Sequence, residues 1–304
     1  MARSPLERLN LPYIRWQSET HDWEENMVAF QSALASLAVL LPVALLQFPT
    51  GLNLQVQTDE PQIAGIDHHQ IINPRLSPYS AIGKLKGTMT CTAAMVLDPR
   101  IIVTAAHCVM DRDGAIRRSS LSFQPGYQFG SDLGWIGATV WAVGSKQSVS
   151  HELVGDAARD WAILVLDQAP PDVRPLRLDG RPFETLDLGE PRLLLPAYSN
   201  DIAGAEALSL DPSCSFRDLI WDTLVHDCMA AAGSSGAPLL MREGREYVVV
   251  GIHVASLFAS DKDGRVAELV GNQAVGSWMF ETAASALVRK LNSEPVQAIN
   301  SGEY

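Results

Sequence analysis

Ser235 lies in a run of small residues whose types could support nucleophilic chemistry. The run extends from Ala232 to Pro238 and reads AGSSGAP. Glycine adopts backbone angles that other residues avoid, so the chain could turn sharply here and direct the amides of Gly233 and Ser235 at one spot beside the serine oxygen. Two such amides would stabilise a negatively charged oxygen while the serine attacks a carbonyl group. Small residues in a run are also typical of a simple tight turn, so this stretch alone assigns no function.

Two earlier stretches contain the groups that a serine nucleophile needs. His107 follows Val103-Thr104-Ala105-Ala106, and Asp160 precedes the apolar segment from Trp161 to Leu164. A hydroxyl is a poor nucleophile until an imidazole takes its proton, and the imidazole needs a carboxylate to fix its tautomer. Separately, His107 could be a histidine at the end of a helical turn and Asp160 a strand cap. Together and in this order, the three residues predict a catalytic triad.

These three motifs resemble those of the trypsin-like serine proteases, and residues 103–108 match the family's histidine motif at every position. The resemblance covers roughly residues 75–292. It implies an endopeptidase that works through an acyl-enzyme without a cofactor, with His107 and Asp160 on one β-barrel and Ser235 on another. It also implies a disulfide between Cys91 and Cys108, and a second candidate bridge joins Cys214 to Cys228. Four core thiols in a cytosolic protein would be the alternative.

Departures from trypsin itself are informative about the branch of the family. Ser234 stands where vertebrate members keep an aspartate, and the Gly251-Ile252-His253 stretch resembles the bacterial secreted members that include glutamyl endopeptidases. The resemblance therefore implies that His253 donates a hydrogen bond to an acidic substrate side chain; a structural strand histidine is the other interpretation. Met229 occupies the position of trypsin's specificity aspartate, which argues against cleavage after Lys or Arg. Ala230 stands where the glutamate-reading enzymes keep a threonine, which weakens that analogy.

The order of the predicted elements agrees with an all-β fold of two antiparallel six-stranded barrels. Strand-like segments recur between residues 81 and 166 and again between 191 and 280, including 207–210 and 222–225. No alternation of strands with helices appears, which excludes a parallel α/β sheet. Ala169-Pro170-Pro171 would break any strand and is the natural crossover. Residues 281–291 have apolar side chains at helical spacing and predict a C-terminal helix, followed by a tail over 293–304.

Residues 1–54 predict a leader before the protease domain. The segment from Met27 to Pro49 is uncharged, and its apolar centre from 34 to 46 has the length of a signal-peptide core, although 27–49 could also cross a bilayer as an anchor. Arginines precede this run, so the positive-inside rule predicts export of the chain beyond residue 49. Whether Met1 or Met27 is the start stays open. Residues 55–74 are polar and rich in proline, which predicts a linker.

Composition and sequence motifs argue against a nucleic-acid partner and against a metal. The net charge of −12 and the lack of Lys and Arg clusters argue against nucleic acid as a partner. The resemblance to the serine proteases implies a protein or peptide substrate. His151-Glu152 begins like a zinc-protease motif, but Gly155 replaces the second histidine, so we predict no metal. A catalytically silent, protease-shaped module tethered by residues 27–49 is an alternative function. An α/β-hydrolase using the Ser235 turn would need an acid and then a histidine later in the chain, and His253 is too close behind.

Overall fold

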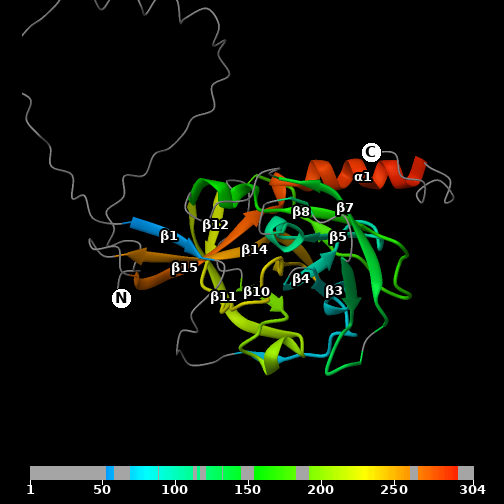
Figure 1. Ribbon diagram of the computed structural model, residues 1–304, viewed down its shortest axis with the longest axis horizontal. Coiled ribbons are helices and arrows are strands. Elements are labelled where there is room, and N and C mark those ends of the chain that lie inside the picture. The colour runs from blue at the N-terminus through cyan, green and yellow to red at the C-terminus, as the bar shows by residue number, and fades with distance from the viewer. Residues whose placement is uncertain are drawn as a thin grey trace, which may run out of the picture. The chain divides into compact units, whose positions relative to one another are not determined.

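The computed structural model describes residues 53–57, 69–87, 89–111, 115–116, 121–131, 133–144, 154–182, 192–260 and 266–293. The predicted leader up to residue 52, with its apolar run 27–49, and the tail after residue 293 lie outside these ranges. Among the described residues, no helix has both the length and the apolar character needed to span a membrane. Strands dominate the described chain, and Figure 1 shows them wound around two centres with one α-helix alongside.

The first half of the domain forms a closed antiparallel barrel whose strands pair in the order β3-β4-β5-β8-β7-β6. Its core is made of buried apolar side chains from these strands, and in β4 and β5 nearly every residue is buried. At Gly83 an added Cβ would lie 2.4 Å from the ring of Phe123, so glycine lets this ring fill the barrel. The strands are β3 (Ile82–Lys86), β4 (Thr90–Met95), β5 (Ile101–Thr104), β6 (Ser122–Pro125), β7 (Ile136–Val143) and β8 (Ala162–Leu166).

The second half closes in the same way, because β14 and β15 pair directly and complete the ring β14-β13-β10-β11-β12-β15. A cluster of buried leucine, valine and alanine side chains fills it together with both cysteines of the second disulfide. The strands are β10 (Arg192–Ala197), β11 (Ser209–Ile220), β12 (Thr223–His226), β13 (Pro238–Glu243), β14 (Glu246–Ser260) and β15 (Val266–Gly276). The predicted pair of six-stranded antiparallel barrels is therefore confirmed.

Three short strands lie outside the two rings. β1 (Asn53–Gln57) pairs with β14, β2 (Gln70–Ile71) pairs with β11, and β9 (Arg177–Leu178) pairs in parallel with β14. The segment expected to be a linker over 55–74 thus contributes part of β1 and all of β2 to the sheets. This differs from the sequence expectation because strand pairing to residues far along the chain leaves no local signal.

The C-terminal helix α1 (Glu281–Ser293) extends two residues beyond the predicted 281–291. It buries Ala284, Leu287 and Leu291, which lie on one face at helical spacing. Lys290 places its Nζ 4.5 Å from the ring centroid of Trp141 in β7, so the helix that follows the second barrel contacts the first (Figure 1).

Candidate active site

His107 and Asp160 are joined by two hydrogen bonds within the first barrel. His107 lies in the 3-10 turn η3 (Ala106–Val109) directly after β5, and Asp160 lies between η4 (Val154–Arg159) and β8. Antiparallel pairing of β5 with β8 brings these two strand ends together. The backbone N–H of His107 donates to Asp160 Oδ1 at 2.9 Å, and His107 Nδ1 lies 2.7 Å from Asp160 Oδ2. The carboxylate can only accept, so Nδ1 carries the proton and Nε2 presents its lone pair.

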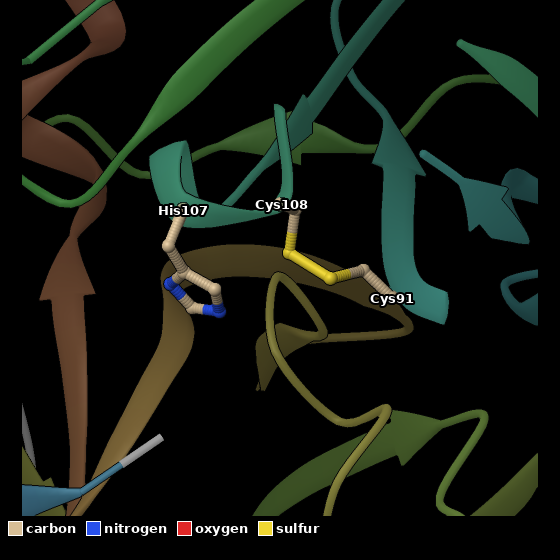
Figure 2. A group of neighbouring side chains, drawn as sticks. All are labelled: Cys91, His107 and Cys108. Atoms are coloured by element: carbon tan, nitrogen blue, oxygen red, sulfur yellow. A yellow bond between two sulfur atoms is a disulfide. The ribbon is translucent and has the colours of Figure 1, made fainter. Parts of the chain in front are cut away.

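A disulfide between Cys91 and Cys108 fixes the turn that carries His107. Figure 2 shows the bridge joining this turn to β4, and both cysteines are 1% exposed. The predicted pairing is confirmed. One ligand atom from each of Cys91, Cys108 and His107 lies within 4.8 Å of the others, a spacing that would suit a metal ion. Sulfurs in a disulfide offer no thiolate, so this grouping reflects the clamp on the histidine turn and not a metal centre.

The turn that carries Ser235 packs against this same part of the first barrel. The carbonyl oxygen of Ser235 accepts a 2.9 Å hydrogen bond from the N–H of Thr92 in β4. Gly236 has a φ of +80°, and an added Cβ there would lie 2.1 Å from Thr104 Oγ1, three residues before His107. Only glycine allows both that conformation and that approach. The glycine after Ser235 therefore lets the two loops meet.

The Ser234 hydroxyl is held by contacts within its own turn. Its side chain is fully buried, and its Oγ accepts a hydrogen bond of 3.3 Å from the N–H of Ala231. Its backbone N–H in turn donates to the Ala231 carbonyl at 2.9 Å. The Ser234 hydroxyl is thus directed back into its own turn, whereas Ser235 keeps 9% of its surface exposed.

The amide of Gly233 is oriented by hydrogen bonds on the other side of its peptide. The carbonyl of Ala232 accepts from the N–H of Asn200 at 2.7 Å, and in a trans peptide this directs the Gly233 N–H the opposite way. The Gly233 φ is +98°, and a Cβ there would lie 2.3 Å from the carbonyl oxygen of Tyr198. Thr92 Oγ1 donates to the Gly233 carbonyl at 2.8 Å and accepts from the Tyr198 N–H at 3.0 Å. One threonine of the first barrel thus holds this loop of the second.

The amide of Ser235 is oriented in the same manner. The Ser234 carbonyl accepts from the N–H of Ala237 at 2.8 Å, which directs the Ser235 N–H away from that bond. None of the hydrogen bonds among the described residues uses the N–H of Gly233 or of Ser235. The amides between and after them, those of Ser234 and Gly236, are both used. This alternation leaves the two predicted amides available for a ligand oxygen.

A family profile for the trypsin-like peptidase domain matches residues 91–252, more than half of the chain. The chain belongs to the trypsin-like peptidase family. Among solved structures, a Glu endopeptidase in complex with MPD is similar with a TM-score of 0.52 and 21% identity, over 73% of this chain and 98% of its own. Protease Anisep from Arthrobacter nicotinovorans has a TM-score of 0.51 and 16% identity, over 71% and 99%. At these identities the similarity shows the shared fold. No match was found among curated protein sequences.

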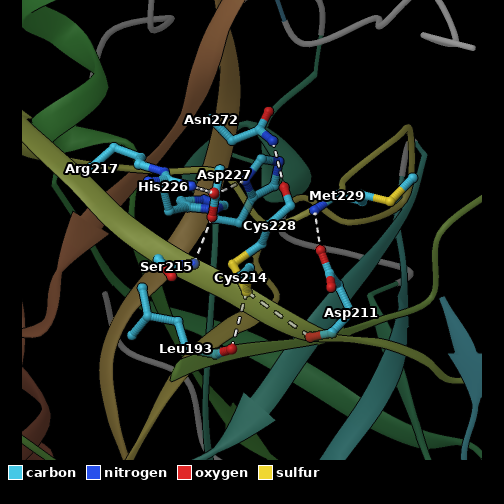
Figure 3. Close-up of a disulfide and its surroundings, with 11 residues drawn as sticks. Leu193, Asp211, Cys214, Ser215, Arg217, His226, Asp227, Cys228, Met229 and Asn272 are labelled. Carbon is cyan, nitrogen blue, oxygen red and sulfur yellow. Dashed lines mark hydrogen bonds and ion pairs between the residues drawn. A yellow bond between two sulfur atoms is a disulfide. The ribbon is translucent and has the colours of Figure 1, made fainter. Parts of the chain in front are cut away.

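The peptidase holds the segment before its serine turn by a second disulfide and two buried polar side chains. Cys214 and Cys228 form the predicted bridge, which is confirmed. Figure 3 shows Asp211 Oδ2 accepting from the N–H of Met229 at 3.0 Å and Asn272 Nδ2 donating to the carbonyl of Cys228 at 2.6 Å. Met229 and Ala230, which directly follow Cys228, are both half-buried. Sequence reasoning missed Asp211 and Asn272, because neither belongs to a local motif.

His253 lies directly beside the serine turn and forms a pair with a second buried histidine. Its backbone accepts from the N–H of Gly236 at 2.7 Å, and its Nδ1 lies 3.3 Å from Nε2 of His226. The pKa of His253 is lowered to about 3, mainly by burial and also by the nearby imidazole of His107, whereas Asp160 acts in the opposite direction. Burial and His253 together hold the pKa of His226 well below its usual value. Both imidazoles are therefore neutral at physiological pH. Sequence analysis missed His226, which meets His253 only through the pairing of both strands with β15.

Proposed function

We propose that this peptidase is an endopeptidase that uses His107, Asp160 and Ser235 as a catalytic triad. The observation that carries the proposal is the doubly hydrogen-bonded His107–Asp160 pair beside the serine turn. Support comes from the alternation of used and unused amides in that turn and from the buried, internally bonded hydroxyl of Ser234.

In this mechanism each group has one task. Ser235 Oγ forms a bond to the scissile carbonyl carbon while His107 Nε2 takes its proton, and Asp160 stabilises the imidazolium. The carbonyl oxygen becomes negatively charged and accepts hydrogen bonds from the Gly233 and Ser235 amides. His107 then gives its proton to the leaving amine, and the C–N bond breaks to leave an ester on Ser235. Water deprotonated by His107 attacks this ester and releases the acid product.

The experiment that tests this function is labelling with a fluorophosphonate, which reacts with an activated serine. We expect the wild-type chain and Ser234→Ala to be labelled and to hydrolyse peptides, and Ser235→Ala to do neither while retaining the native fold. The alternative, a silent module tethered through residues 27–49, predicts a folded wild type without labelling. Silent modules of this kind have usually lost one residue of the triad, whereas His107, Asp160 and Ser235 are all present in this sequence.

We further propose that the substrate side chain before the scissile bond is acidic, or small and polar, and is recognised by His253 beside Met229 and Ala230. Support comes from the contact of His253 Nδ1 with His226 Nε2. When the His226 Nε2–H donates in this contact, His253 carries its own proton on Nε2 and can donate it to a carboxylate. Peptide-library profiling of wild type against His253→Ala is the test. Cleavage after Lys or Arg, or an unchanged profile in the variant, would leave His253 a structural residue.

Export of the protein is also proposed. The two disulfides support it, because such bridges persist in oxidising compartments. The proposal divides the chain into a leader over 1–54 with a signal peptide or anchor in 27–49, a connecting segment over 55–74 that contributes to the short strands β1 and β2, the protease domain over 75–292 and a tail over 293–304. Cell fractionation, amino-terminal sequencing and peptide mapping without reductant test it. Four free thiols in the native protein would remove the argument for export.

A further inference from the structure

The strand β1 lies on a particular edge of β14. β15 pairs with residues 251–260 of β14, so β1, which pairs with residues 256–260, must lie on the opposite edge. That opposite edge is the one that β13 uses at residues 246–252. Figure 1 shows β1 in blue beside the end of β14 and β15. Along one edge of β14, β13 therefore pairs with residues 246–252 and β1 pairs with residues 256–260.

Between these two partners, the same edge is used by the serine turn. The N–H of His253 donates to the Ala237 carbonyl at 2.8 Å, and its carbonyl accepts from the Gly236 N–H. β1 thus begins to pair three residues beyond the contact with the Ser235 turn. Because Asn53 lies opposite Ser260 and Gln57 opposite Ser256, β1 runs along this edge toward the serine. β1 also contacts η4, which ends immediately before Asp160.

A peptide substrate needs this same edge. A chain whose scissile carbonyl lies at Ser235 must continue past His253, where this edge of β14 would offer backbone N–H and C=O groups to an extended segment if β1 were not paired there. A substrate added in antiparallel orientation would occupy the place of β1. We propose that residues 53–57 are an internal competitor that holds the substrate-binding edge and lowers the affinity of the enzyme for extended peptides. This inference rests on the proposed endopeptidase function.

The composition and attachment of β1 fit a reversible competitor. The strand NLQVQ is five residues long, and such a short pairing gives little stability by itself. Its covalent attachment makes its docking intramolecular, so that β1 competes at a high effective concentration. A peptide at lower concentration must displace it, which raises KM without changing the groups that perform the chemistry.

The test compares two double variants of the full chain. Gln55→Pro/Val56→Pro removes two adjacent backbone N–H groups, of which one faces β14 because successive groups alternate. Gln55→Thr/Val56→Thr changes the same side chains but keeps the backbone able to pair, and is the matched control. We expect the proline variant to lower KM for a peptide of four or more residues before the scissile bond by about tenfold, which corresponds to about 1.4 kcal/mol. We expect kcat to be unchanged and the threonine variant to behave as wild type.

Three further measurements separate this inference from the proposed function. Hydrolysis of an ester of a single acetylated amino acid and labelling by a fluorophosphonate do not use the edge, so both should be equal in all three proteins. In chains that also carry Ser235→Ala, fluorescence anisotropy should show the same tenfold gain in peptide affinity for the proline variant. Equal peptide affinity and KM in all three proteins, with labelling intact, would overturn the competitor and leave the protease. Absence of labelling in every protein would overturn both.

Discussion

The side-chain oxygen of Ser234 accepts a hydrogen bond from Ala231, three residues earlier in the same turn. Of the two adjacent hydroxyls, that of Ser234 is therefore engaged within its own turn, which agrees with the proposed role of Ser235 as nucleophile. We expect Ser235→Ala to abolish hydrolysis and Ser234→Ala to retain most of it, with a loss of about 1 kcal/mol in stability for the missing hydrogen bond. Steady-state kinetics and urea unfolding measure the two effects. An inactive Ser234→Ala protein with an active Ser235→Ala protein would reverse the assignment.

Asp160→Asn should reduce kcat by about four orders of magnitude, as a lost tautomer-fixing carboxylate does in this type of triad. The amide can donate to His107 Nδ1, which would move the imidazole proton to Nε2 and remove the base. Its oxygen can still accept from the His107 N–H, so the fold should persist. Kinetics with a peptide substrate, together with circular dichroism, check this result. Near-normal kcat would mean that another acid orients His107.

Thr92→Val should impair catalysis although Thr92 is not part of the triad. The change keeps the shape but removes the hydroxyl that bonds both Gly233 and Tyr198. The Gly233 loop would relax, and we expect kcat to fall by about tenfold, less than the 100-fold or more for complete loss of an oxyanion donor. Thr223→Val is the control, because it removes an equally buried hydroxyl that bonds Ile220 and Gln273. Equal kcat values for the two variants would exclude the positioning role.

Stability should fall as the pH decreases below about 6.5. The folded protein holds His226 and His253 neutral, with the pKa of His253 lowered to about 3, whereas both bind protons near pH 6.5 when unfolded. The unfolded state then binds more protons, so each group contributes up to about 1.4 kcal/mol of unfolding free energy lost per pH unit. Urea unfolding between pH 6.5 and 5, above the range of ordinary carboxylates, measures this slope. His226→Gln should reduce it, and an unchanged slope would contradict the buried pair.

Removing either disulfide should destabilise the fold by about 3 kcal/mol in the chain-entropy account, since both close loops of similar length. Their separations are 17 and 14 residues. The functional effects should differ. Cys91→Ser/Cys108→Ser loosens the turn that carries His107 and should lower kcat. Cys214→Ser/Cys228→Ser loosens the segment around Met229, which is proposed to contact the substrate, and should raise KM. Urea unfolding and kinetics of the two double variants distinguish these outcomes.

The sequence was most informative where chemistry is confined to short stretches. The residues around His107, Asp160 and Ser235 are local motifs whose order identifies the family, and the cysteines beside them gave both disulfides. Long-range pairing was harder to predict. The sequence predicted a strand only over 207–210, yet β11 continues from Ser209 to Ile220 because neighbouring strands on both sides hold it. β1 and the His226–His253 pair depend on partners far along the chain, which no local pattern records.

The hydroxyl of Thr92 joins two parts of the fold that are synthesised at different times. It belongs to the first barrel and holds Gly233 of the second, while Gly236 meets Thr104 across the same junction. A chain made from its N-terminus completes the barrel with His107 and Asp160 before Ser235 has been synthesised, and domains of this kind fold as units. A half-made chain would then have neither a nucleophile nor a formed oxyanion site. The proposed activity therefore cannot arise until the second barrel has been synthesised and has packed against the first.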